Sequence, residues 1–89
     1  MKEGMQLLGL KVREVVTGFS GVVTSVSFDL YGCVQALVSP GVKDGKLGDQ
    51  VWFDVKRLMV SDLEPVMAVP DFAEVPGGQA LSQYQSQPV

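Results

Sequence analysis

The fold is decided by residues 21–28, GVVTSVSF, and by residues 33–39, CVQALVS. Apolar or β-branched side chains recur at every second position along residues 21–28. One face is expected to carry Val22, Thr24, Val26 and Phe28, and the other Val23, Ser25 and Ser27. A period of two with β-branched residues is typical of a strand. Residues 33–39 repeat this pattern and end at Pro40, so the two segments predict neighbouring strands.

Further short strands are expected on both sides of this pair, at residues 10–16, 50–54 and 58–60. Asp44–Gly45 predicts a tight turn between residues 40 and 49, and residues 55–58 fit a single helical turn. Gly18 and Gly21 are expected where the chain bends sharply. Five short strands with tight connections bury a common core by closing into a small barrel or a two-layer sandwich. The order of loops favours an all-β, SH3-like barrel.

The composition changes near Leu63, which divides the 89-residue chain into a barrel domain, residues 1–63, and a tail, residues 64–89. The tail holds four of the five prolines and a Gln/Ser-rich run at residues 79–87. Too few apolar side chains lie there to offset the entropy of ordering, so the tail is expected to be mostly disordered, above all beyond Pro76. Residues 66–69 are apolar, and they could instead lie along the barrel as an extra strand.

The charges are distributed unevenly along the chain. Seven basic and seven acidic residues lie before residue 64, so the barrel is neutral, and Glu64, Asp71 and Glu74 account for the net charge of −3. A neutral barrel with an acidic tail offers little attraction to phosphate, which disfavours nucleic acid as a partner. No segment reaches the roughly 20 apolar residues of a membrane span, and the N-terminus lacks the apolar run of a signal peptide. With a single cysteine, these features predict a cytoplasmic protein.

The residues that usually carry catalysis or metal binding are scarce. The chain has no histidine and one cysteine, Cys33, which excludes a Cys/His zinc site and leaves no histidine base to activate a nucleophile. Cys33 is expected to be a buried, small hydrophobic residue of its strand. The candidate carboxylates for acid–base chemistry are Asp29, Asp44, Asp49 and Asp54, mostly near predicted turns. We therefore expect no enzyme activity, cofactor or metal, and a surface ion pair between Asp54 and Arg57.

Three aromatic residues are the candidates for an interaction surface: Phe19 at a turn, Tyr31 in a loop, and Trp52. If Val51 and Phe53 face the core, the side chain of Trp52 points the other way and is at least partly exposed. Exposed aromatic residues of this kind are enriched at protein interfaces. The alternative is that loops or the tail cover Trp52, which would then belong to a small satellite cluster of the core.

Several motifs occur in a fixed order, at residues 15–24 (VVTGFSGVVT), 31–35 (YGCVQ), 38–40 (VSP), 44–46 (DGK), 52–54 (WFD) and 57–58 (RL). This order resembles a group of small, functionally uncharacterised phage and prophage proteins, with one residue fewer between Tyr31 and Gly32. The resemblance implies a phage or prophage origin and a small β-fold. A shorter pattern, at residues 9–12 and 18–23, is similar to the KOW segment of RNA-contacting SH3-like modules.

These observations lead to one preferred function and three alternatives. The preferred function is a non-enzymatic protein-interaction module, acting as a homo-oligomer or on an unidentified protein partner. The alternatives are a counter-defence protein that inhibits a host enzyme or captures a nucleotide signal, a minor virion or assembly component, and a KOW-like RNA-binding module. If the chain is phage-encoded, it is expected in the cytoplasm of the host cell.

Overall fold

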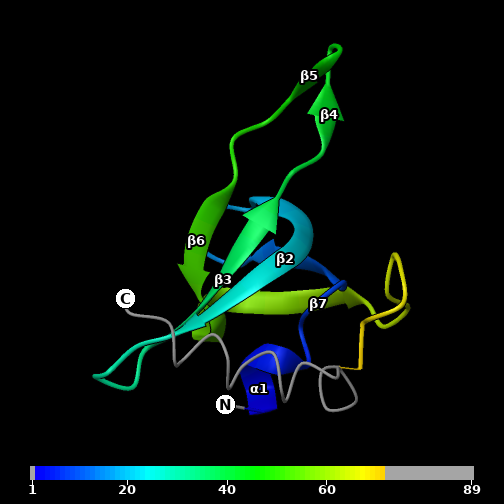
Figure 1. Ribbon diagram of the computed structural model, residues 1–89. Coiled ribbons are helices and arrows are strands. Elements are labelled where there is room, and N and C mark those ends of the chain that lie inside the picture. The colour runs from blue at the N-terminus through cyan, green and yellow to red at the C-terminus, as the bar shows by residue number, and fades with distance from the viewer. Residues whose placement is uncertain (1, 72–89) are drawn as a thin grey trace, which may run out of the picture.

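Antiparallel strand pairing organises the chain into one curved sheet (Figure 1). A computed structural model describes residues 2–71 of the protein. The sheet contains the strands β1 (Lys11–Glu14), β2 (Ser20–Phe28), β3 (Val34–Ser39), β6 (Val51–Asp54) and β7 (Leu58–Asp62). Their order is β6-β3-β2-β1-β7, so β1 and β7, the first and last of these strands in the chain, lie side by side at one end of the sheet. The fold is the small all-β, SH3-like barrel expected from the sequence.

Four short elements complete the fold. They are the helix α1 (Lys2–Met5), the strands β4 (Val42–Lys43) and β5 (Lys46–Leu47), and the 3-10 helix η1 (Val55–Arg57). The strands β4 and β5 form a hairpin that projects from the barrel in Figure 1, with Asp44 and Gly45 both at positive φ at its tip. The predicted turn and the predicted helical connector are thereby confirmed. The helix α1 was not predicted, because four residues are too few to show a helical period.

The core is small and comes from four strands. Val12, Val23, Ala36, Val38 and Phe53 are buried, and they lie on β1, β2, β3 and β6. Further apolar side chains pack against them while remaining partly exposed: Leu7, Leu8, Phe19, Val26, Val51, Val55, Leu58 and Val60. A core of this size gives a thin stability margin, which polar contacts elsewhere in the barrel must support.

The expected alternation along β2 is wrong beyond its middle. Val23 pairs with Val38, but the next paired residue is Ser25, opposite Leu37, so Thr24 is an extra residue in the strand. This bulge reverses the alternation, and both Val23 and Val26 face the core. A bulge also bends a strand and increases its twist, which a nine-residue strand needs in order to curve around so small a barrel.

Two glycines mark the bends that the sequence predicted. Gly18 lies in the turn before β2 with φ of 81°, in the left-handed region that favours glycine. Gly21 faces the end of β3 so closely that a Cβ atom would lie 2.2 Å from the Ser39 carbonyl oxygen. Any side chain at residue 21 would therefore force the two strands apart.

The described beginning of the tail lies against the barrel without forming a strand. The backbone N–H of Val66 donates to the Gly9 carbonyl oxygen at 2.9 Å, and the Met67 backbone passes close to Gly9. The predicted disorder beyond Pro76 concerns residues outside those that the structure describes. Within residues 2–71, no helix has the length and apolar character needed to cross a membrane.

Candidate functional site

Trp52 lies on the face of β6 that points away from the core. Its neighbour Phe53 is 8% exposed, whereas Trp52 is 45% exposed. Val51 of β6 and Val55, the first residue of η1, pack against the core cluster, as the sequence pattern predicted. An indole that is nearly half exposed on a regular strand leaves a large apolar surface in contact with water.

Trp52 belongs to an uncharged strip across three strands. Leu37 of β3 lies directly opposite Trp52, and Ser25 of β2 lies directly opposite Leu37. Paired residues of antiparallel strands project from the same face of a sheet, so these three side chains form one row. We call this row, Trp52, Leu37 and Ser25, the outer strip.

The outer strip ends at a free edge of the sheet. Within residues 2–71, β6 pairs with β3 on one side and has no strand on its other side. The four residues of β6 include no lysine or proline, and its pairing with β3 shows no register shift. A bulge, lysine or proline would disturb an edge, so β6 is a short, regular edge whose first three residues are apolar and whose last is Asp54.

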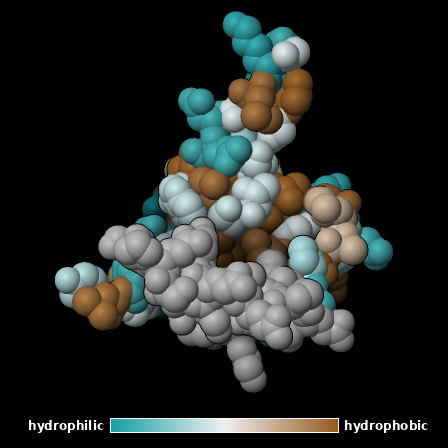
Figure 2. All heavy atoms as spheres, in the orientation of Figure 1, coloured by the Kyte–Doolittle hydropathy of each residue, from teal (hydrophilic) through white to brown (hydrophobic). Residues whose placement is uncertain are grey.

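A second apolar surface lies on the loop between β2 and β3. The Asp29 carboxylate accepts hydrogen bonds from the backbone N–H groups of Tyr31 and Cys33, each at 2.9 Å. The loop closes with two backbone hydrogen bonds, from Asp29 to Cys33 and from Gly32 to Asp29. This frame holds Leu30 and Tyr31 outward, 90% and 87% exposed. Figure 2 shows hydrophobic atoms on this loop and on the β4–β5 hairpin.

The three aromatic residues predicted for an interaction surface are placed on three separate elements. Phe19 lies in the β1–β2 turn, and its ring packs on the Phe53 ring with a centroid distance of 5.5 Å. It is therefore partly buried against the core, whereas Tyr31 and Trp52 are exposed. The outer strip and the β2–β3 loop remain as the candidate surfaces.

The expectation that Cys33 is buried is wrong. The strand β3 begins at Val34, one residue later than the sequence pattern suggested, and Cys33 is an exposed residue of the loop. The alternation of buried residues in β3 therefore starts at Val34 and continues through Ala36 and Val38. The Cys33 thiol is in contact with solvent instead of the core.

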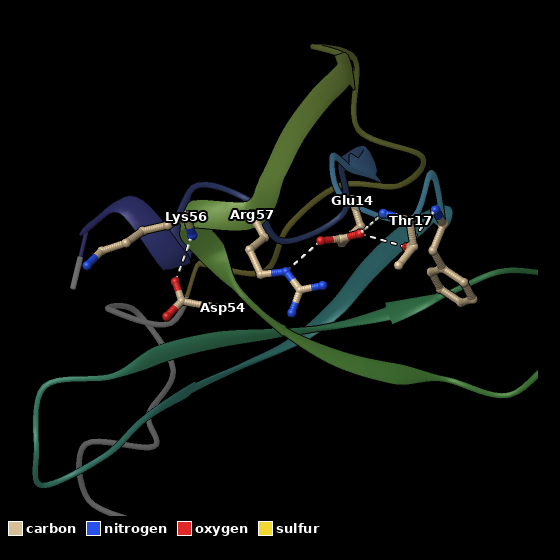
Figure 3. A network of polar contacts seen from close by, with 6 residues as sticks. Glu14, Thr17, Asp54, Lys56 and Arg57 are labelled. Atoms are coloured by element: carbon tan, nitrogen blue, oxygen red, sulfur yellow. Dashed lines mark hydrogen bonds and ion pairs between the residues drawn. The ribbon is translucent and has the colours of Figure 1, made fainter.

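A buried carboxylate, which the sequence analysis did not single out, holds the β1–β2 turn (Figure 3). Glu14 is fully buried, and one of its oxygens accepts hydrogen bonds from the Thr17 N–H and hydroxyl groups, at 2.5 and 2.6 Å. Its other oxygen accepts a hydrogen bond from Arg57 Nε at 2.5 Å. Every buried side-chain polar atom among the described residues has a partner. The Glu14 network therefore joins the first turn of the barrel to the connector before its last strand.

The network also determines the charge of Glu14. Burial by itself raises the pKa of this carboxyl, but the hydrogen bonds from Thr17, Arg57 and the Val16 backbone outweigh burial and lower the pKa to about 2. Hydrogen bonds to the ionised form and a nearby cation both favour the carboxylate. Glu14 is therefore ionised at neutral pH, and its charge is used within the fold.

The expected ion pair between Asp54 and Arg57 does not form. The Asp54 carboxylate accepts a hydrogen bond from the Lys56 backbone N–H at 2.8 Å and thereby caps η1, while Arg57 turns to Glu14 (Figure 3). The Arg57 guanidinium also lies over the Phe53 ring, 5.3 Å from its centroid. Asp29 stabilises its turn, as the sequence suggested for acidic residues near turns, whereas the capping role of Asp54 was not predicted.

Within residues 2–71, no group of three Cys, Asp or Glu side chains is arranged to hold a metal ion. Comparisons of the chain with models of protein families, with curated proteins and with solved structures find no match.

Proposed function

We propose that this protein is a small, non-enzymatic interaction module of phage or prophage type, which acts through protein contacts in the cytoplasm of the host cell. The observation that carries the proposal is the outer strip, where Trp52 lies beside Leu37 at a free edge of the sheet. Aromatic side chains in such positions dominate the binding energy of many protein interfaces. A rigid strand also positions the indole before binding, which lowers the entropy lost on association.

Two further observations support a binding role over a catalytic one. Asp29 and Asp54, which the sequence offered as acid–base candidates, accept backbone hydrogen bonds that shape their own turns. The β2–β3 loop holds Leu30 and Tyr31 outward on a hydrogen-bonded frame, which suits an apolar anchor for a partner. The charge-poor character of both surfaces favours a protein partner over a nucleic acid.

The test is affinity capture with matched baits. Wild-type protein, Trp52→Ser and Met59→Ser are immobilised and exposed to extract from infected host cells, which contains host proteins, phage proteins and the chain itself. Retained proteins are quantified by mass spectrometry. Met59 is the control, because it is 60% exposed on β7 at the opposite edge of the sheet. We expect at least one protein that the wild type and Met59→Ser retain and that Trp52→Ser loses.

The identity of the retained protein separates the roles that a binding module can have. A host enzyme would indicate counter-defence, and a head or tail protein would indicate virion assembly. Identical retained proteins for all three baits would contradict the proposal, because the outer strip would then contribute nothing to binding.

A further inference from the structure

We propose that the partner of the outer strip is a second copy of this chain, whose β6 pairs with β6 in antiparallel fashion about a two-fold axis at Trp52. The inference rests on the proposed function, because it names the partner of that same surface. Adding a strand to a free edge satisfies outward-facing backbone N–H and C=O groups. Two identical edges that pair in this way give a closed dimer with one shared interface.

The two edges of the sheet differ in how well they can accept a strand. The pairing of β6 with β3 runs from Val51 to Asp54 without a shift, whereas the pairing of β7 with β1 shifts register between Lys11 and Val12. A bulge twists an edge away from a flat, pairable geometry. The edge of β6 is therefore the better template for a further strand.

The faces of the sheet restrict the register of the proposed pair. Directly opposed residues lie on the same face, so a continuous sheet pairs outward residues with outward residues. Pairing Trp52 with the partner's Trp52 meets this condition and places Phe53 opposite the partner's Val51, both on the core side. Moving the register by two residues would place Trp52 opposite the partner's Asp54 in one direction and opposite the partner's Gln50 in the other, so the indole would face a polar side chain in both cases. The first register is favoured because it buries both indoles against each other.

The charges beside β6 fit the same arrangement. Asp49 precedes the strand and Lys56 follows it, and both are exposed. In an antiparallel pair centred on Trp52, Asp49 of each copy lies opposite the partner's Val55, with Lys56 on one side of that residue and Asp54 on the other. The Asp54 carboxylate accepts the Lys56 backbone N–H of its own chain, so the exposed Lys56 ammonium is the group left to contact Asp49 at each end of the pair. An antiparallel pair of β6 with the partner's β7 would instead bring Asp49 near the partner's Asp62, where like charges repel.

The experiment measures self-association of the full chain by sedimentation velocity, under reducing conditions because Cys33 is exposed. We expect the wild type to dimerise at micromolar concentration. Trp52→Ser should raise the dimer dissociation constant by about 30-fold or more, because truncating a central aromatic anchor typically has this effect. The control Met59→Ser, at the other edge, should dimerise as the wild type does. Trp52 is the sole tryptophan, so its emission should shift to shorter wavelength as the dimer forms.

Charge reversal tests the two-fold arrangement directly. Asp49→Lys and Lys56→Glu should each weaken the homodimer by about tenfold, because each places like charges at both contacts. An equimolar mixture of the two variants should dimerise more tightly than either alone, because both contacts then join opposite charges. The double variant D49K/K56E should regain wild-type affinity. Circular dichroism checks that each variant remains folded.

The outcomes separate this inference from the proposed function. A dimer that is unaffected by the charge reversals, or a mixture no tighter than its components, would overturn the β6 pairing. A strict monomer would overturn it as well. In both cases the proposed function would stand if affinity capture still showed a Trp52-dependent protein, and it would fail if capture showed none.

Discussion

Two turns of this barrel each contain a carboxylate that accepts hydrogen bonds from residues just after it in the chain, yet the two turns have different roles. In the β1–β2 turn Glu14 binds Thr17 and also Arg57, 43 residues away along the chain. In the β2–β3 loop Asp29 binds only nearby backbone groups and is exposed. The first turn is tied into the fold, and the second shapes a projecting surface. Local hydrogen bonding forms both turns, and the long-range contact with Arg57 joins only the first of them to a distant part of the barrel.

The largest effect should follow from breaking the long-range contact of the β1–β2 turn, which is the hydrogen bond from Arg57 to Glu14. Glu14→Gln keeps the shape of the side chain but places an amide NH₂ or a neutral oxygen where Arg57 Nε needs a carboxylate. The loss of a buried, hydrogen-bonded charge should lower the melting temperature by about 10 °C or more, followed by circular dichroism. Glu64→Gln makes the same chemical change at an exposed position and should have little effect. Equal melting temperatures for the two variants would contradict the role given to Glu14.

The Glu14 carboxylate should also make the free energy of unfolding depend on pH. The pKa of Glu14 is about 2 in the folded protein against 4.5 as its ordinary value, so folding is favoured wherever the group is ionised. This contribution is fully present above the unfolded pKa and is lost as the pH falls through the folded pKa. We expect the free energy of unfolding, measured with urea, to fall between about pH 5 and pH 2. In Glu14→Gln that fall should be clearly smaller.

A smaller effect should follow from removing a local contact of the same network, the hydrogen bond from the Thr17 hydroxyl to Glu14. Thr17→Val deletes the hydroxyl that donates to Glu14 at 2.6 Å but keeps the side-chain volume. A hydrogen bond to a charged group contributes about 1.5 to 3 kcal/mol, and the loss should lie near the lower end because the backbone N–H bond persists. Thr17→Ser retains the hydroxyl and is the control. Chemical denaturation of the three proteins measures the difference, and a loss in Thr17→Ser equal to that in Thr17→Val would contradict it.

The sequence predicts the strand pattern and the turns well, because both depend on neighbouring residues. The exposure of Trp52 beside buried Phe53 and the turn at Asp44 follow from alternation and from turn chemistry. The role of Glu14 was missed, although it lies two residues after Val12 and therefore on the same, core-facing side of β1. Its partner Arg57 lies 43 residues away along the chain. The sequence suggested instead that Arg57 pairs with Asp54, which is only three residues from it. The bulge at Thr24 was missed as well, because alternation within a strand does not reveal where its partner shifts register.

The exposed turn should respond differently from the buried one. Asp29→Ala removes the acceptor for the N–H groups of Tyr31 and Cys33, which lie at the surface where water can replace it. The global stability should change by less than about 1 kcal/mol, while amide hydrogen exchange at these two residues should speed up. Asp29→Asn keeps an oxygen acceptor and should leave exchange close to wild type. Unchanged exchange in Asp29→Ala would show that the two backbone hydrogen bonds alone hold the loop.

The smallest effect should come from Cys33→Ser, which tests where the loop ends and the core begins. Cys33 is exposed, so exchanging its thiol for a hydroxyl should change stability by no more than about 0.5 kcal/mol. Ala36→Ser is the matched change three residues further along, where the side chain is fully buried and an unpaired hydroxyl costs about 1–3 kcal/mol. A thiol reagent should also label Cys33 in the native protein at nearly the rate of the unfolded chain, because no burial protects it. A slow native reaction together with a loss in Cys33→Ser as large as in Ala36→Ser would place Cys33 inside the core. The start of β3 would then lie one residue earlier than Val34.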